Sequence, residues 1–103
     1  MANDFREMIG ADRVIHEPAR LVIMAILYAA ESADFVYLLR ETGLTKGNLS
    51  SHFAKLEDAG YVAIEKGFQG KIPRTTYRLT DAGRAAFGQY RERLRQAANT
   101  LPG

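Results

Sequence analysis

The chain has 103 residues and no cysteine. That absence excludes a disulfide scaffold, a thiolate metal site, a thiol redox switch and a cysteine nucleophile. Long apolar runs are also lacking, because the longest one, Leu21 to Ala30, is far too short to span a bilayer. Asn3, Asp4 and Arg6 interrupt any apolar segment near the start, so we expect no signal peptide. These features predict a cytoplasmic protein without a membrane partner.

Histidine is scarce too, and only His16 and His52 are present. Asp12 and His16 stand four residues apart, which is a weak ligand pair without a nearby third donor. We therefore predict no metal and no cofactor. The serines lack an evident histidine and carboxylate arrangement, and no glycine loop suited to a phosphate is found. The chain is not expected to be an enzyme.

The composition is that of one folded domain with a modest core, since 47% of the residues are hydrophobic. Charge is distributed unevenly, because acids outnumber bases up to residue 44 and bases outnumber acids from 45 to 78. The bases of the second region are Lys46, Lys55, Lys66, Lys71, Arg74 and Arg78. Such an excess suits a phosphate-binding face and an ordinary solvated surface equally well.

A helix is predicted over residues 46–59. Thr45 can cap its first turn, Leu44 can pack onto Leu49, and Gly60 supplies the stop. Its buried stripe is spaced at i, i+4 and i+7. The residues of that stripe are Leu49, Phe53 and Leu56.

The opposite face of this helix is small and polar. Gly47, Ser51 and Ala54 lie nearly opposite the apolar stripe, and Asn48, Ser50 and Lys55 flank them. Small side chains let a helix backbone approach base edges, while Asn, Ser and Lys supply hydrogen-bonding groups. The face therefore predicts DNA contact, although Lys46 and Lys55 suit phosphate contact and plain solvation equally. His52 borders the apolar stripe, and we expect it to be packed and hydrogen-bonded rather than to read a base.

Two helices are predicted before this one. The first begins near Pro18 and runs through Tyr28, and the second is capped by Asp34 and ends at Gly43. A short helix carrying Phe5, Met8 and Ile9 is a further possibility at the N-terminus. Because a tight turn containing glycine joins the second helix to the helix at 46–59, the pair has the form of a helix-turn-helix unit.

A β-hairpin is predicted after Gly60, with strands at 61–66 and 75–79 and a loop over 67–73. Its tip and second strand carry Gln69, Lys71, Arg74 and Thr75, which can reach a phosphate or the minor groove. Phe68 in the loop could pack on the domain or contact a partner, and we expect packing.

A terminal helix is predicted from Asp81, with Thr80 as its cap. Apolar residues recur along it in steps of three and four, as in a heptad seam. Part of this seam can pack on its own domain, and the remainder predicts dimerisation. The seam consists of Phe87, Tyr90, Leu94, Ala97 and Leu101.

The order of these elements, together with several motifs, resembles small winged-helix transcriptional regulators of the MarR/ArsR type. The motifs are Glu17-Pro18-Ala19-Arg20-Leu21-Val22-Ile23-Met24, Leu44-Thr45-Lys46-Gly47-Asn48-Leu49-Ser50-Ser51-His52, Leu56-Glu57-Asp58-Ala59-Gly60-Tyr61-Val62 and Arg74-Thr75-Thr76-Tyr77-Arg78-Leu79-Thr80-Asp81-Ala82-Gly83. The resemblance implies an α+β, mostly α fold: a winged helix-turn-helix with a two-stranded β-hairpin wing and terminal dimerisation helices. We expect one domain over 1–103, with an N-terminal extension at 1–16, a winged-helix core at 18–79 and a C-terminal dimerisation helix at 81–101.

The resemblance also implies a prokaryotic homodimer that binds a pseudo-palindromic operator in double-stranded DNA and regulates transcription. A small-molecule effector between the terminal helices and the DNA-binding unit is permitted, and the sequence does not define its chemistry. Ser51 stands where many relatives carry a larger basic residue, and the cysteine motif of metal-sensing members is absent. The alternative function is a winged-helix module that binds protein and not DNA. The predicted DNA-binding residues are Thr45, Lys46, Gly47, Asn48, Ser50, Ser51, Lys55, Gln69, Lys71, Arg74 and Thr75.

Overall fold

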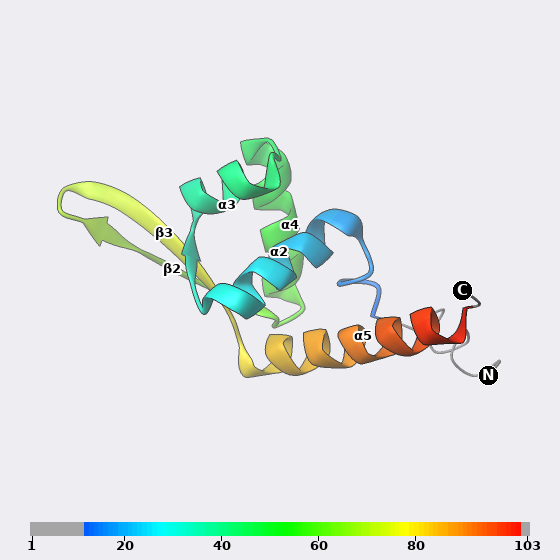
Figure 1. Cartoon of the computed structure of the whole chain (residues 1–103). Helices are drawn as coiled ribbons and strands as arrows, with labels where there is room; N and C mark the ends of the chain where they lie inside the picture. The colour runs from blue at the N-terminus through cyan, green and yellow to red at the C-terminus, as the bar shows by residue number, and fades with distance from the viewer. Residues whose placement is uncertain (1–11, 102–103) are drawn as a thin grey trace.

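The structure is a computed structural model that describes residues 12–101. Within that range, helices and a small sheet follow one another in the predicted order, with a hairpin projecting to one side and a long helix running along the base (Figure 1). The elements are α2 (Pro18–Ala30), β1 (Ala33–Asp34), α3 (Phe35–Thr42), α4 (Lys46–Asp58), β2 (Val62–Gln69), β3 (Ile72–Leu79) and α5 (Asp81–Thr100). The short helix considered around Phe5, Met8 and Ile9 lies outside the described residues. The predicted winged helix-turn-helix architecture is confirmed.

The core forms where α2 meets α4 and the sheet. Ile23, Met24 and Leu27 of α2 are fully buried, as are Leu49 and Leu56 of α4. The apolar character of α2 extends beyond this face, because the side chain of Val22 is 47% exposed. Burial of this inward face packs α2 against α3 and α4 of the helix-turn-helix unit and against β3 of the sheet.

The sheet has three antiparallel strands in the order β1-β3-β2. Strand β1 was not expected from the sequence, and it pairs Ala33 with Tyr77 and Asp34 with Thr76. A strand of two residues has no readable alternation, so periodicity gives no signal for it. Its effect is to attach the start of α3 directly to the base of the hairpin.

The hairpin ladder is longer than predicted. Strands β2 and β3 pair continuously from Val62 and Leu79 to Gln69 and Ile72, so the loop expected at 67–73 is wrong except at its centre. The chain reverses at Gly70 and the residue after it, and Gly70 has φ +64°, a value that suits glycine in two-residue hairpin turns. Pro73 is tolerated within the strand because β1 pairs only near the base, which leaves that part of β3 at an open edge.

The start of α5 is held against the segment that follows α4 by hydrogen bonds and by a close backbone approach. The Thr80 hydroxyl donates to the Gly60 carbonyl (2.6 Å), and the Thr80 N–H donates to the Tyr61 carbonyl (3.0 Å). The Thr80 hydroxyl oxygen also caps α5 by accepting from the Gly83 N–H (3.0 Å). A Cβ added at Gly83 would lie 2.1 Å from the Tyr61 carbonyl oxygen. Only glycine therefore permits this approach. Among the described residues, no helix is both long and apolar enough to cross a membrane.

Candidate nucleic-acid interface

Both ends of α4 have the backbone partners that hold a helix in place. At the N-terminus, the Thr45 hydroxyl accepts from the Asn48 N–H (3.1 Å), as predicted. At the C-terminus, Gly60 has φ +80° and its N–H donates to the Glu57 carbonyl (2.9 Å). The Tyr61 N–H donates to the Leu56 carbonyl (3.0 Å), which completes a Schellman motif. Helix α4 ends at Asp58, one residue before the predicted end.

The predicted apolar stripe of α4 faces the core. Leu49, Phe53 and Leu56 are at most 2% exposed, and the Phe53 ring stacks on Tyr77 of β3 with centroids 3.9 Å apart. Burial raises the pKa of Tyr77, and the Glu57 carboxylate adds to this rise. The stacked pair sets the position of α4 relative to the hairpin. The side chains predicted to contact DNA from this helix are all exposed, namely those at Thr45, Lys46, Asn48, Ser50, Ser51 and Lys55, together with Gly47.

His52 is packed and hydrogen-bonded, as expected. Its Nδ1 lies 3.2 Å from the Arg20 guanidinium and 3.5 Å from a Glu17 carboxylate oxygen. Partial burial acts to raise the pKa of Glu17, but hydrogen bonds from the Arg20 and Ala19 N–H groups outweigh it and hold that pKa below its usual value. His52 therefore joins α4 to the start of α2.

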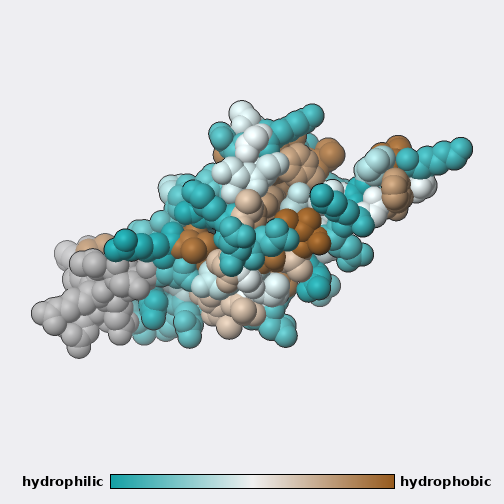
Figure 2. All heavy atoms as spheres, turned by 180° about the vertical axis from the view of Figure 1, so that it is seen from behind, coloured by the Kyte–Doolittle hydropathy of each residue, from teal (hydrophilic) through white to brown (hydrophobic). Residues whose placement is uncertain are grey.

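The wing, residues 62–79, extends beyond the helices and is exposed from residue 65 to residue 74. Lys71 lies in its turn, while Gln69 and Arg74 lie on its strands. The expectation that Phe68 packs on the domain is wrong, because its side chain is 75% exposed. Ile72 is 71% exposed. Apolar and hydrophilic side chains stand together at the end of this projection (Figure 2), which extends away from the helices of the described residues (Figure 1).

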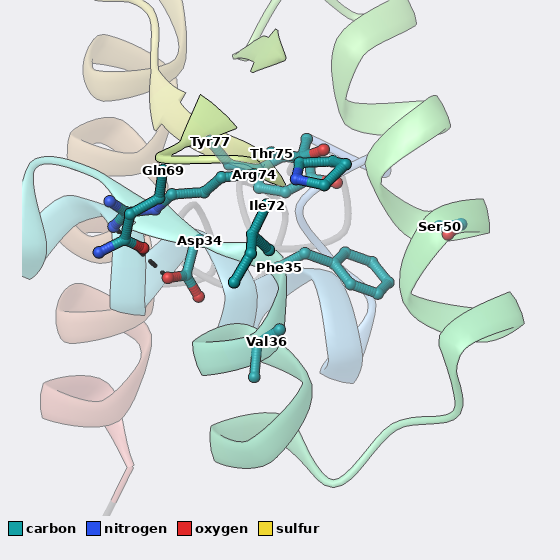
Figure 3. A pocket seen from close by; sticks show the side chains of 10 residues that line it. Asp34, Phe35, Val36, Ser50, Gln69, Ile72, Arg74, Thr75 and Tyr77 are labelled. Carbon is teal, nitrogen blue, oxygen red and sulfur yellow. Dashed lines mark ion pairs between the residues drawn. The ribbon is translucent and has the colours of Figure 1, made fainter. Parts of the chain in front are cut away.

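An open groove of about 450 Å³ lies between α3, α4 and the wing. It brings together Ser50 from α4 and three predicted wing residues, Gln69, Arg74 and Thr75. In Figure 3, Gln69, Arg74 and Asp34 gather at one side of the groove and Ser50 projects from α4 at the other. The remaining lining residues are Phe35, Val36, Ile72, Pro73 and Tyr77. The other predicted DNA-binding residues lie outside the groove, on the outer face of α4 or in the turn of the wing.

Asp34 is the functional candidate that the sequence analysis treated only as a cap. One of its carboxylate oxygens accepts from the Tyr37 N–H (2.7 Å) and caps α3. The other lies 3.4 Å from the Arg74 guanidinium, so one side chain joins α3 to the wing. The sequence gives no sign of this ion pair, because Asp34 and Arg74 are brought together by the pairing of β1 with β3, which was not expected.

The predicted dimerisation seam divides into two parts. Phe87 and Tyr90 are buried in their own chain, where Phe87 contacts the Tyr28 ring (centroids 5.1 Å apart) and the Tyr90 hydroxyl lies 2.8 Å from His16 Nδ1. Leu94 and Leu101 are 45% and 58% exposed, and Ala97 is half-buried. The second part of the seam therefore stays accessible on a single chain.

Asp12 and His16, the weak metal-ligand pair, contact tyrosines in the structure. The Tyr61 hydroxyl donates to Asp12, and this hydrogen bond, with burial and the Asp12 charge, raises the pKa of Tyr61 to about 12. His16 lies against the Tyr90 hydroxyl. The two side chains thus attach the segment before α2 to the residue that precedes β2 and to α5.

Comparison with known proteins agrees with this architecture. Residues 19–98 match the model of a winged helix DNA-binding domain. An uncharacterised protein of Methanocaldococcus jannaschii is 33% identical over 90 residues, which cover 86% of this chain and 97% of that protein. A transcriptional regulator homologue from Pyrococcus horikoshii OT3 superposes with a TM-score of 0.90 at 29% identity, covering 98% of this chain and 99% of its own.

A regulator described as belonging to the MarR family, from Enterococcus faecalis V583, superposes with a TM-score of 0.65. The alignment covers 97% of this chain and 93% of that one. At 21% identity, this likeness establishes a shared fold.

Proposed function

This chain belongs to the winged helix DNA-binding domain family, and we propose that it binds double-stranded DNA sequence-specifically as a homodimeric transcriptional regulator. In this proposal α4 and its cap, residues 46–59, enter the major groove. Residues 67–74 of the wing lie on the phosphates and the minor groove. The sites on both elements are predictions from the sequence that the geometry supports.

The observation that carries the proposal is the groove between α4 and the wing. Hydroxyl, amide and guanidinium groups are the usual partners of backbone phosphates, and Ser50, Gln69 and Arg74 bring all three to one concave surface. With the outer face of α4 in the major groove, the neighbouring sugar-phosphate strand would follow this surface toward the wing. Ser50 and Thr75 would then approach the strand from opposite sides.

Dimerisation is proposed through the accessible part of the α5 seam. Leu94 and Leu101 are exposed large apolar residues. Leu94 lies on α5, which runs along the base of the domain (Figure 1), and Leu101 is the residue directly after that helix. A two-fold pair formed there would set two recognition helices about 34 Å apart, the repeat of successive major grooves. Leu94→Glu should yield monomers with weak DNA affinity, measured by light scattering and by binding to a duplex. A fully dimeric variant would refute this interface.

The test of DNA binding is selection of duplexes from a random pool, followed by affinity measurement at several salt concentrations. Affinity should fall steeply with salt because phosphate contacts release counterions. Replacing Lys71 and Arg74 together with Ala should weaken binding to all sequences and reduce the salt slope. The matched control is the double replacement of Arg91 and Arg95 on α5, which removes the same charge. Because these residues flank Leu94 of the proposed dimer seam, light scattering must show that the variant is still dimeric, and its salt slope should then be unchanged.

Two outcomes would decide against the proposal. If the protein shows no detectable binding to duplex DNA at low salt, the proposal of DNA binding is refuted. If the two double variants change the affinity and the salt slope equally, the wing has no specific role in binding. The part played by α4 is tested separately, because Ser51→Arg should change which sequences are selected.

A further inference from the structure

The end of the wing is apolar on both faces. Cross-strand partners in an antiparallel ladder share a face, and successive residues of a strand alternate between faces. Phe68 is paired with Pro73, and Ile72 is paired with Gln69. Phe68 and Ile72 therefore lie on opposite faces of a two-stranded ribbon, and both are more than 70% exposed. A monomer gains nothing from keeping two large apolar side chains in water at the end of a projection.

The surroundings of these two side chains are basic. The outer half of the wing carries Lys66, Lys71 and Arg74 against the single acid Glu65, and the Asp34 carboxylate beside the wing pairs with Arg74, which leaves a net basic surface. A matching surface must be apolar where the tip enters and anionic on both sides of it. The minor groove of DNA has this character, since its walls are deoxyribose rings and its rims are phosphates.

We propose that the apolar tip is a wedge that enters the minor groove: Phe68 opens a base step, Ile72 on the opposite face packs against the deoxyribose wall, and Lys66, Lys71 and Arg74 lie on the flanking phosphates. Phe, Ile and Pro are side chains that architectural DNA-binding proteins insert in this way, and insertion kinks the duplex toward the major groove. The inference rests on the proposed function and extends it from phosphate contact to deformation of the DNA. Selected sites should contain a flexible pyrimidine-purine step at the position of the wing.

The first experiment separates the wedge from the charges. Phe68→Gln should lower affinity for the selected duplex roughly tenfold, the loss expected for one buried aromatic side chain, and should leave the salt slope unchanged. Phe68→Leu, which keeps an apolar side chain, should retain most of the affinity. Lys71→Ala should reduce the salt slope. Because Phe68 is exposed, thermal unfolding of all these variants should match that of the wild type.

The second experiment observes the DNA. The chain contains no tryptophan, so Phe68→Trp places a single indole reporter at the tip. Binding should quench its fluorescence, and a fluorescent adenine analogue should brighten when placed at the opened step and not at neighbouring steps. End-labelled duplexes should show a bend by energy transfer with wild type and Phe68→Leu, and a smaller bend with Phe68→Gln.

The outcomes separate a failure of DNA binding from a failure of the wedge alone. If wild type binds no duplex, both the proposed function and the wedge fail. If wild type binds and Phe68→Gln binds equally well with the same bend, the wedge is overturned while DNA binding stands. If Phe68→Gln instead dissociates an oligomer in the absence of DNA, a second copy of the chain covers the tip and the wedge is equally overturned.

Discussion

Helix α4 and the wing differ in how the rest of the molecule holds them. The helix has capped ends, a buried stripe and an aromatic ring stacked on β3. The base of the wing is packed in the core through Val62, Tyr77 and Leu79, but its outer half, residues 65–74, is exposed and is held by the hairpin ladder and by the ion pair of Arg74 with Asp34. In the proposed complex with DNA, the firmly held helix would set the position of the domain and the less constrained ribbon would adapt to the duplex.

Two phenylalanines give the largest expected contrast. Phe53→Ala should lower the free energy of unfolding by about 3–5 kcal/mol, because a buried ring is lost from the joint between α4 and β3. Phe68→Ala should leave the free energy of unfolding unchanged. Denaturant unfolding of both variants checks this, and a similar loss in each would show that the wing is as firmly packed as the helix.

The next contrast lies within α5, at two glycines. Gly83→Ala should destabilise the protein by about 2–3 kcal/mol, since its Cβ would overlap the Tyr61 carbonyl at the junction with α4. Among the described residues, no atom outside the local helix backbone lies within 4 Å of a Cβ built at Gly88, so Gly88→Ala should stabilise the protein by about 0.5–1 kcal/mol through helix propensity. If the melting temperatures of Gly83→Ala and Gly88→Ala moved in the same direction, the close approach of Gly83 to the Tyr61 carbonyl would be contradicted.

The N-terminal cap of α4 should have a smaller effect. Thr45→Ala removes the acceptor of the Asn48 N–H and should lower the free energy of unfolding by about 1 kcal/mol. Thr45→Ser keeps that acceptor and is the matched control. Hydrogen exchange of the first-turn amides should accelerate in the alanine variant alone.

The smallest effect on stability is expected at Asp34. Asn also caps helices, so Asp34→Asn should keep α3 intact and remove only a partly exposed ion pair, a change within about 1 kcal/mol. DNA affinity should rise, because the carboxylate no longer competes with phosphate for Arg74. A fall in affinity would instead make Asp34 a positioning residue for Arg74.

The sequence predicted elements whose signals are local. As helix-capping residues, Thr45, Gly60 and Thr80 bond to backbone atoms within three residues, and the helix ends that they mark were placed to within one residue. The predicted DNA-binding residues of α4 were found on an exposed face because a buried stripe at helical spacing fixes the opposite face as well.

The failures have one physical cause, which is contact between residues distant in the chain. Strand β1 exists through pairing with residues 76 and 77, and the same pairing brings Asp34 to Arg74. Gly67 and Pro73 have the composition of a loop, yet the turn at Gly70 sets a register that extends both strands past them. Phe68 was expected to pack on the domain, but the longer ladder places it away from the described helices, and its side chain is exposed.

The contact between Gly83 and Tyr61 has a mechanical consequence. Backbone touches backbone there, so α5 cannot slide past the end of α4, and it acts as a lever with its fulcrum at this point. A helix of 20 residues is about 30 Å long, so a tilt of about 5° at the fulcrum displaces its far end by about 2.6 Å. In a two-fold assembly joined at the far ends, such a tilt would change the separation of the two recognition helices, and it would have to shift the contacts of Phe87 and Tyr90 with Tyr28 and His16.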